Sequence, residues 1–109
     1  MAYYLIQAAY TPEGWAAQVK NPQDVRARVQ AAMEKLGGKL VGVWYAFGEY
    51  DLVAIAEYPS NVNAAAYALA VMSSAIKTYK TTPLMTVEEG IEAMQQAAEA
   101  GAVYRPPGS

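Results

Sequence analysis

Two strand-like runs follow one another with almost no connection between them, and this arrangement limits the possible folds more than any other feature of the sequence. Residues 39–47 and 50–58 are rich in β-branched and aromatic side chains, and only Gly48 and Glu49 separate them. Glycine at the first central position favours a two-residue type II′ turn, which joins antiparallel strands. The sequence therefore predicts a β-hairpin in the middle of the chain.

The segment before the hairpin predicts a strand followed by a helix. Residues 3–10 form the strand-like run. Asn21 followed by Pro22 is typical of a helix start, with Asn21 as the N-cap and Pro22 as the first helical residue. Gly37 and Gly38 are expected to end this helix. Its apolar stripe has helical spacing and consists of Val25, Val29, Met33 and Leu36.

The segment after the hairpin predicts an alanine-rich helix and a fourth strand. Ser60 or Asn61 is a suitable N-cap for the helix. Residues 75–82 form the strand-like run, and Pro83 is expected to end it. The apolar stripe expected on this helix consists of Val62, Ala66, Leu69 and Ser73.

A third helix is predicted near the C-terminus. Thr86 and Glu89 have the spacing of a capping box, which opens a helix over residues 87–98. Residues 101–109 contain two consecutive prolines and no periodicity, so we expect a tail there.

The predicted elements follow the order strand, helix, strand, strand, helix, strand. This order is the split βαβ pattern of the ferredoxin-like fold, and right-handed crossovers place both main helices on one face of an antiparallel four-stranded sheet. We expect an α+β protein with a single such domain over residues 1–100, an extra C-terminal helix within it, and a tail over residues 101–109.

The hairpin strands are apolar on both faces. The predicted register places Val43 and Tyr45 on one face, and Leu40 and Trp44 on the other. A sheet covered by helices on one side needs only one apolar face, so the second face predicts burial against another copy of the chain. We expect a homodimer first and a trimer or larger ring second.

The chain contains no histidine and no cysteine, and this limits its chemistry. The composition excludes imidazole bases, thiol nucleophiles, His or Cys metal sites, and disulfides. There is also no clustered acidic loop of the kind that binds Ca²⁺. We therefore expect no metal and no cofactor.

The charge pattern makes polyanionic partners unexpected. The net charge is −2, and the eight Lys and Arg residues are scattered rather than gathered in a basic stripe. The longest apolar run is far too short to span a bilayer, and the N-terminus does not have the pattern of a signal peptide. We expect a cytoplasmic protein that binds neither nucleic acid nor membrane.

Residues 48–51, Gly-Glu-Tyr-Asp, fit the Gly-x-Tyr-Asp pattern for which the GYD domain family is named. Residues 2–5, 21–24 and 80–90 also resemble this family, in the same order, so the resemblance covers nearly the whole chain. The family in turn resembles dimeric α+β barrel proteins and the ligand-sensing domains of Lrp/AsnC-type regulators. This resemblance implies ferredoxin-like protomers that associate through their sheets.

Asp51 and Glu49 are the candidate catalytic residues. Asp51 would share a strand face with Val53 and Ile55, and a partly desolvated carboxylate is a possible general base. In the alternative interpretation, Asp51 accepts hydrogen bonds from nearby backbone amides and fixes the hairpin.

Aromatic side chains and one lysine are the candidate ligand-binding residues. Lysines on the fourth strand either protect an exposed sheet edge or line a pocket for an anionic or aromatic small molecule. Trp15 lies on a short segment that either packs over the domain edge or closes a pocket between helix and sheet. The candidates, in that gap or at a subunit interface, are Tyr4, Trp15, Trp44, Tyr45, Tyr50 and Lys77.

These features favour a homo-oligomeric domain that binds or senses a small molecule. One alternative is a structural protein that assembles through its sheet. Another is a cofactor-free enzyme of the α+β barrel kind, isomerase- or cyclase-like, with Asp51 or Glu49 as base and a tyrosine hydroxyl as acid. The absence of histidine and cysteine favours binding over catalysis.

Overall fold

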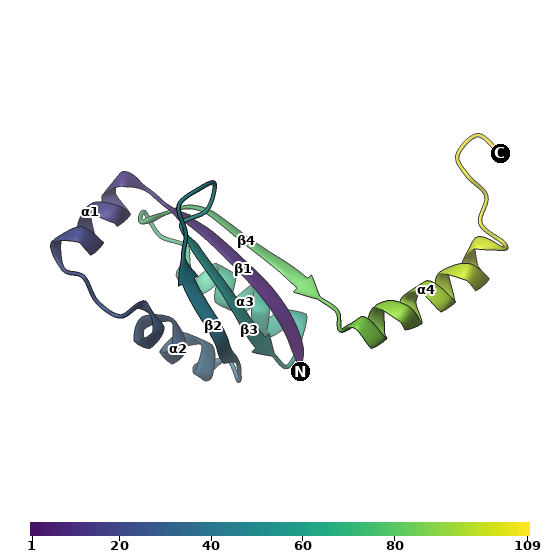
Figure 1. Cartoon of the computed structure of the whole chain (residues 1–109), viewed down its shortest axis with the longest axis horizontal. Helices are drawn as coiled ribbons and strands as arrows, with labels where there is room; N and C mark the ends of the chain where they lie inside the picture. Colours follow the sequence, from purple (N-terminus) through teal and green to yellow (C-terminus); the bar gives the residue numbers. More distant parts are fainter.

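A four-stranded sheet with helices on one face forms the body of the molecule in the structure, a computed structural model that describes residues 1–109 (Figure 1). The strands lie in the order β2-β3-β1-β4, and every neighbouring pair is antiparallel. This topology confirms the expected α+β, ferredoxin-like fold. The elements are β1 (Ala2–Tyr10), α1 (Pro12–Lys20), α2 (Val25–Lys35), β2 (Lys39–Tyr45), β3 (Leu52–Tyr58), α3 (Asn61–Val71), β4 (Ile76–Leu84) and α4 (Val87–Gly101).

The core lies between the sheet and helices α2 and α3. Alternate residues of β1 and β3 point into it, because successive side chains of a strand face opposite sides. The ring of Tyr58 lies 5.7 Å from the ring of Tyr4 and 6.2 Å from the ring of Tyr67, so tyrosines join the sheet to α3. The largest buried cluster consists of Tyr4, Ile6, Met33, Ala54, Ala56, Tyr58, Ala64 and Tyr67.

The short segment around Trp15 forms a nine-residue helix, α1. Thr11 caps it, because its side-chain oxygen accepts a hydrogen bond from the amide of Gly14 at 3.0 Å. Gly14 is buried, and a Cβ atom at this position would lie 2.5 Å from the carbonyl oxygen of Ala75. Glycine therefore lets α1 approach the start of β4 closely.

The two ends of α2 correct one prediction and confirm another. The N-cap is Asp24, whose carboxylate accepts from the amide of Arg26 at 2.9 Å, so the prediction of Asn21 was wrong. A carboxylate is favoured there because it faces the positive end of the helix dipole. The predicted stop is confirmed, since Gly37 has φ 75° and the amide of Gly38 donates to the carbonyl oxygen of Met33 at 2.8 Å.

The connection between β2 and β3 differs from the predicted turn. It spans residues 46–51, and Gly48 does not have the positive φ that a type II′ turn requires. The amide of Ala46 donates to the carbonyl oxygen of Asp51, and the amide of Asp51 donates to that of Ala8, both at 2.8 Å. The first bond closes the loop, and the second ties it to β1. The strands pair as expected, but the prediction of a two-residue turn was wrong.

β4 is an edge strand, which explains its polar composition. Lys77 and Lys80 are exposed on it, as expected for a strand that avoids pairing with other sheets. Pro83 does not end the strand as predicted but lies within it, opposite Tyr4. An edge strand tolerates proline because one of its sides has no neighbour to bond.

α3 packs a different side against the sheet than its sequence predicted. Ala64 and Tyr67 are buried, whereas Val62 and Leu69 of the predicted stripe are exposed. The helix is apolar on most sides, so the spacing of its apolar residues did not identify the buried one. The contact between Tyr67 and Tyr58 fixes the observed orientation.

The sheet face opposite the helices, called the open sheet face below, is not covered. A bulge between Leu40 and Gly42 turns Leu40 to the helix-covered face, opposite Ala56, which corrects the predicted register at the start of β2. The rest of the open sheet face keeps its apolar character, and Trp44 is 56% exposed on it. Its larger apolar side chains, according to the strand register, are Tyr3, Leu5, Trp44, Val53, Ile55 and Leu84.

α4 projects away from the body of the molecule (Figure 1). Its capping box is confirmed, because the Thr86 hydroxyl accepts the amide of Glu89 at 3.1 Å and the Glu89 carboxylate accepts the amide of Thr86 at 2.9 Å. The helix continues to Gly101, and none of its residues is buried. The radius of gyration is 17.8 Å, against about 13 Å for a compact domain of similar length. No helix in the structure combines the length and the apolar character needed to cross a membrane.

Candidate ligand-binding site

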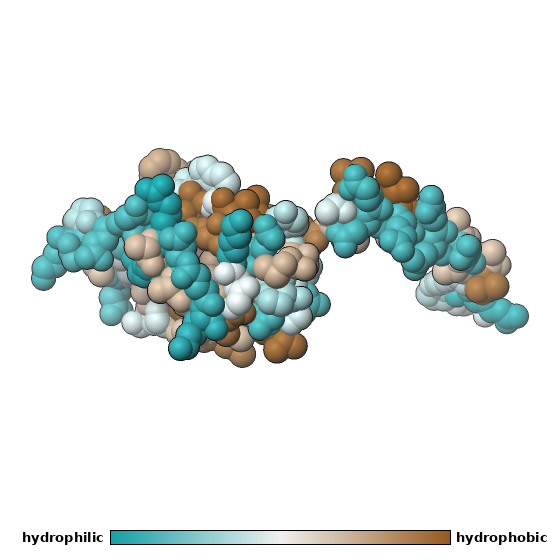
Figure 2. All heavy atoms as spheres, turned by 90° about the horizontal axis from the view of Figure 1, so that it is seen from below, coloured by the Kyte–Doolittle hydropathy of each residue, from teal (hydrophilic) through white to brown (hydrophobic).

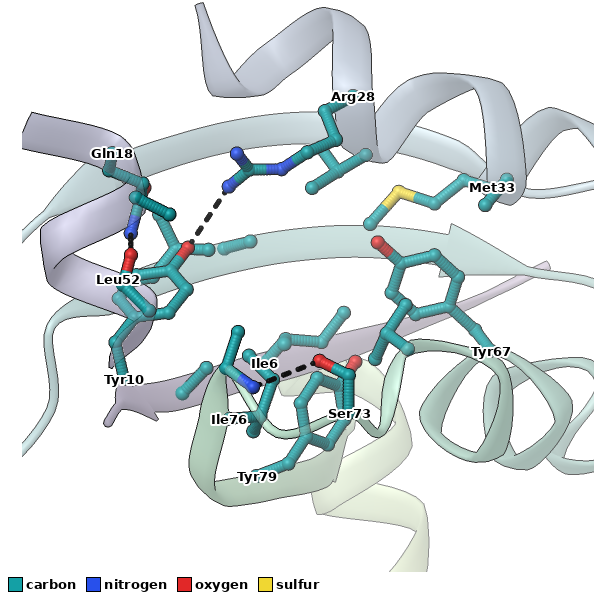
Figure 3. Close-up of a pocket in the computed structure, with 18 residues that line it drawn as sticks. Ile6, Tyr10, Gln18, Arg28, Met33, Leu52, Tyr67, Ser73, Ile76 and Tyr79 are labelled. Carbon is teal, nitrogen blue, oxygen red and sulfur yellow. Dashed lines mark hydrogen bonds between the residues drawn. The ribbon is translucent and has the colours of Figure 1, made fainter. Parts of the chain in front are cut away.

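A cavity of about 340 Å³ lies between the sheet and helices α1, α2 and α3 (Figure 3). Of its 18 lining residues, 14 are hydrophobic. Ala8 of β1 and Ala54 of β3 lie in its floor, where larger side chains would fill the space. The volume falls within the range of about 300–1,000 Å³ that is typical of ligand pockets, and well-packed cores rarely leave such a void.

One end of the cavity is polar and positively charged. Arg28 of α2 donates a hydrogen bond from Nη2 to the hydroxyl of Tyr10 at 3.3 Å. Tyr67 of α3 points its hydroxyl into the cavity towards α2 (Figure 3). Arg28 is the only charged residue in the lining. Arg28 is exposed to solvent, and its guanidinium has no acidic partner, because the one ion pair of the structure joins Arg26 to Asp24.

The sheet side of the cavity carries a further hydroxyl. Tyr79 of β4 lines the cavity, and its hydroxyl is buried without a hydrogen-bond partner in the protein. Leaving such a group unpaired costs about 1–3 kcal/mol, and the oxygen has almost no accessible surface, so it does not face the open space of the cavity. Ser73 lies nearby, and its hydroxyl already accepts the amide of Ala75 at 3.3 Å.

Burial raises the pKa values of the phenols that line the cavity. Burial raises the pKa of Tyr67 from 10.0 to about 12, although the nearby guanidinium of Arg28 partly opposes this. Burial also raises the pKa of Tyr10 and of Tyr79. Phenols are protonated at neutral pH in any case, so the hydroxyls of Tyr10 and Tyr67 are hydrogen-bond donors that a ligand can use.

An alkaline titration is expected to separate the buried phenols from the exposed ones. The chain has nine tyrosines, and exposed ones ionise near pH 10. Burial raises the pKa of Tyr58, Tyr67 and Tyr79, so the stability that depends on their protonation is complete below pH 10 and is lost as the pH rises through 12. Tyrosinate absorbance, followed together with circular dichroism, should show a late phase that coincides with unfolding. Ionisation of all tyrosines near pH 10 in a folded protein would contradict this.

A second cluster beside the cavity joins the β2–β3 loop to β1 and α1. Asp51 Oδ2 accepts hydrogen bonds from the amide of Tyr10 at 2.9 Å and from the indole nitrogen of Trp15 at 3.2 Å. The Trp15 ring lies 5.2 Å from the ring of Tyr10 and 6.3 Å from that of Tyr45. The carboxylate of Asp51 thus holds α1 against the end of β1. The structural alternative predicted bonds from nearby backbone amides that fix the hairpin, whereas the two donors here belong to β1 and α1.

The candidate residues from the sequence do not gather in one place. Trp15, Tyr45 and Asp51 lie together in the cluster just described, and none of the eight candidates lines the cavity. α1 does form part of the cavity wall through Gly14, Ala17 and Gln18, whereas Trp15 does not line the cavity. Trp44 and Tyr45 together line a second pocket of about 230 Å³ beside the start of α2. The remaining candidates are separate: Tyr4 in the core, Glu49 and Tyr50 in the β2–β3 loop, and Lys77 on β4.

Sequence reasoning missed the polar groups of the cavity. Arg28 follows Val25 by three residues and precedes Ala32 by four, so it lies beside the apolar stripe of α2. A charged residue beside an apolar helix stripe is the feature of the sequence that could have identified Arg28 as a candidate. Tyr67 was missed because the buried side of α3 was assigned incorrectly.

Comparison with known proteins agrees with the observed fold. The GYD domain family matches residues 4–94. The chain is also similar to the crystal structure of FFRP-DM1, with a TM-score of 0.55 and 15% identity, over 78% of this chain and 100% of that chain. This likeness shows a common fold alone, and no curated protein matches the sequence. Because the family match extends over most of the sequence, the chain belongs to the GYD domain family.

Proposed function

We propose that this chain is a homo-oligomeric domain that binds a small molecule with an apolar body and an anionic head in the cavity between its helices and its sheet. The observation that carries this proposal is the unpaired guanidinium of Arg28 at one end of an otherwise apolar cavity of ligand size.

The chemistry of the cavity determines the ligand class. Its apolar floor and walls favour an aliphatic or aromatic body, because burying apolar surface contributes about 25 cal/mol per Å². The guanidinium of Arg28 can bind a carboxylate, sulfonate or phosphate with two parallel hydrogen bonds, and the hydroxyls of Tyr10 and Tyr67 can add donors. No acidic side chain lines the cavity to repel an anion.

The open sheet face supports the homo-oligomeric part of the proposal. Its apolar side chains are continuous across β2, β3, β1 and β4, and monomeric proteins rarely leave a large apolar patch uncovered. Burial against a second copy would remove this surface from water. Native mass spectrometry of the protein as purified is expected to give a dimer or a larger closed oligomer, and a monomer would contradict this part.

Binding is favoured over catalysis by the position of the acids. Asp51 already accepts two hydrogen bonds and lies outside the cavity lining. Glu49 is exposed in the β2–β3 loop. Neither carboxylate faces a ligand held by Arg28, so a general base for proton transfer is not provided there.

Filling the cavity tests the proposal. Anilinonaphthalene sulfonate, an aromatic anion whose fluorescence rises in apolar surroundings, is the probe. Ala32→Phe places a large ring in the cavity wall and is expected to abolish binding, whereas Ala31→Phe, on an exposed neighbouring position of α2, is expected to leave it unchanged. Equal binding by the two variants, with both folded by circular dichroism, would contradict a site in the cavity.

A further inference from the structure

α4 carries an apolar stripe that nothing in one copy of the chain covers. Val87, Ile91 and Met94 are spaced by four and three residues, so they lie along one side of the helix. They are 75%, 47% and 66% exposed. Figure 2 shows the apolar side chains of the projecting helix gathered along one side. Because helices gain most of their stability from packing an apolar side, this helix needs a partner surface.

The charge of α4 is one-sided as well. Glu88, Glu92 and Glu99 lie on one flank of the stripe, since they are spaced by four and seven residues. Residues 87–109 contain four glutamates and one arginine, whereas the rest of the chain contains seven basic and six acidic residues. α4 is therefore complementary to an apolar surface that has positive charge at its border.

The open sheet face has this combination of properties. The strand register places Leu5 between Ile55 and Thr82, and it places Lys80 beside Gln7 on the same face. Lys80 is exposed on the edge strand β4. The face thus has apolar side chains at its centre and Lys80 at the β4 border, while Glu57 at its other side lies opposite Lys39 of β2.

We propose that α4 of one copy packs across the open sheet face of a second copy, with its apolar stripe on Leu5 and Ile55 and its acidic flank towards Lys80. This contact specifies the homo-oligomer proposed above and rests on it, and it places a helix on the open sheet face instead of the second sheet that the family resemblance implies. α4 has 15 residues and β4 has nine, which correspond to lengths of about 22 Å and about 30 Å. The helix therefore fits along the strand.

The direction of α4 favours a second copy over its own sheet. Only Met85 and Thr86 connect it to β4, and the helix points away from the sheet of its own chain (Figure 1). A two-fold axis would allow two copies to cover each other with identical contacts and close the assembly.

Engineered disulfides test this contact without background, because the chain contains no cysteine. One sample carries Met94→Cys on the apolar stripe, and another carries Thr82→Cys on the open sheet face. The two samples are mixed and oxidised, and a disulfide-linked dimer of the two different chains is expected to form. It should form about tenfold or more faster than in a mixture in which Gln96→Cys replaces Met94→Cys, because close contact raises the effective thiol concentration. Gln96 lies on the opposite side of the helix.

Three outcomes would overturn the proposal. The first is linking no faster than with Gln96→Cys. The second is preferential linking of Met94→Cys to itself, which would place α4 against α4. The third is a link within one chain in the Thr82→Cys, Met94→Cys double variant, which would place α4 on its own sheet. The native mass of the unmodified protein separates the two proposals. An oligomeric mass without a link between positions 82 and 94 would contradict only this contact. A monomeric mass would contradict the homo-oligomer as well.

Discussion

Replacing Arg28 by methionine (Arg28→Met) is expected to weaken the binding of anilinonaphthalene sulfonate about tenfold or more, because a hydrogen bond to a charged group contributes about 1.5–3 kcal/mol. The neutral analogue N-phenylnaphthylamine, which has the same aromatic body without the sulfonate, is expected to bind both proteins equally. Methionine keeps an apolar chain in the wall of the cavity, so the change removes the guanidinium charge together with its hydrogen bond to the Tyr10 hydroxyl. Fluorescence titration measures both affinities.

The control for Arg28→Met is Arg26→Met, which changes the net charge by the same amount. Arg26 pairs with Asp24 on the exposed side of α2 and does not line the cavity. Its replacement should leave both probes unaffected. If the two arginine variants lower sulfonate binding equally, the anion responds to the overall charge of the protein, and the anion-binding role of Arg28 is contradicted.

Replacing Asp51 by alanine (Asp51→Ala) is expected to lower the free energy of unfolding by about 2–4 kcal/mol, because two buried or half-buried donors lose a charged acceptor. The backbone amide of Tyr10 and the indole of Trp15 are these donors. Asp51→Asn keeps an acceptor oxygen and should cost less. Urea unfolding measures the change, and Glu49→Ala at the exposed position two residues earlier is the matched control.

A double-mutant cycle separates the two bonds of Asp51. Once Asp51 is alanine, Trp15→Phe should cost less than it does in the unmodified protein, because the indole has already lost its acceptor. Equal costs in the two backgrounds, or an Asp51→Ala variant as stable as the Glu49→Ala control, would show that the carboxylate does not hold α1 in place.

The same bonds give the Gly-x-Tyr-Asp pattern a physical meaning in this chain. Asp51 fastens α1, which forms one wall of the cavity, to the end of β1, which forms part of its floor. Gly48 has open space around it and no positive φ, so the structure gives no steric reason for glycine there. The aspartate is the residue of the pattern that supports the site.

The fold was predictable because its signals are local. The Gly37 stop of α2 and the capping box of Thr86 and Glu89 depend only on residues a few positions apart, and the structure confirms both. The β2–β3 turn was not predictable in this way. Its length is set by bonds from Asp51 to β1, which lies about 40 positions earlier in the sequence.

The cavity depends on distances between helices that no local pattern encodes. Its space arises where Ala8 and Ala54 on the sheet face the gap between α2 and α3, and its polar end forms only when Arg28 and Tyr10 meet. Aromatic side chains such as Trp44 and Tyr45 drew attention in the sequence because of their type. Their positions in space follow from strand register, which the bulge near Gly42 alters.

The most direct test of a ligand site in the cavity uses the methionine methyl groups. Of the five methionines, Met33 lines the cavity, whereas Met1, Met72, Met85 and Met94 are exposed elsewhere. Nuclear magnetic resonance of isotope-labelled methionine methyl groups, recorded while anilinonaphthalene sulfonate is added, reports on each position separately. Binding in the cavity predicts that the Met33 signal moves with saturation while the others stay in place. Saturable shifts at Met85 and Met94 with an unchanged Met33 signal would contradict it, because the probe would then lie on the apolar stripe of α4.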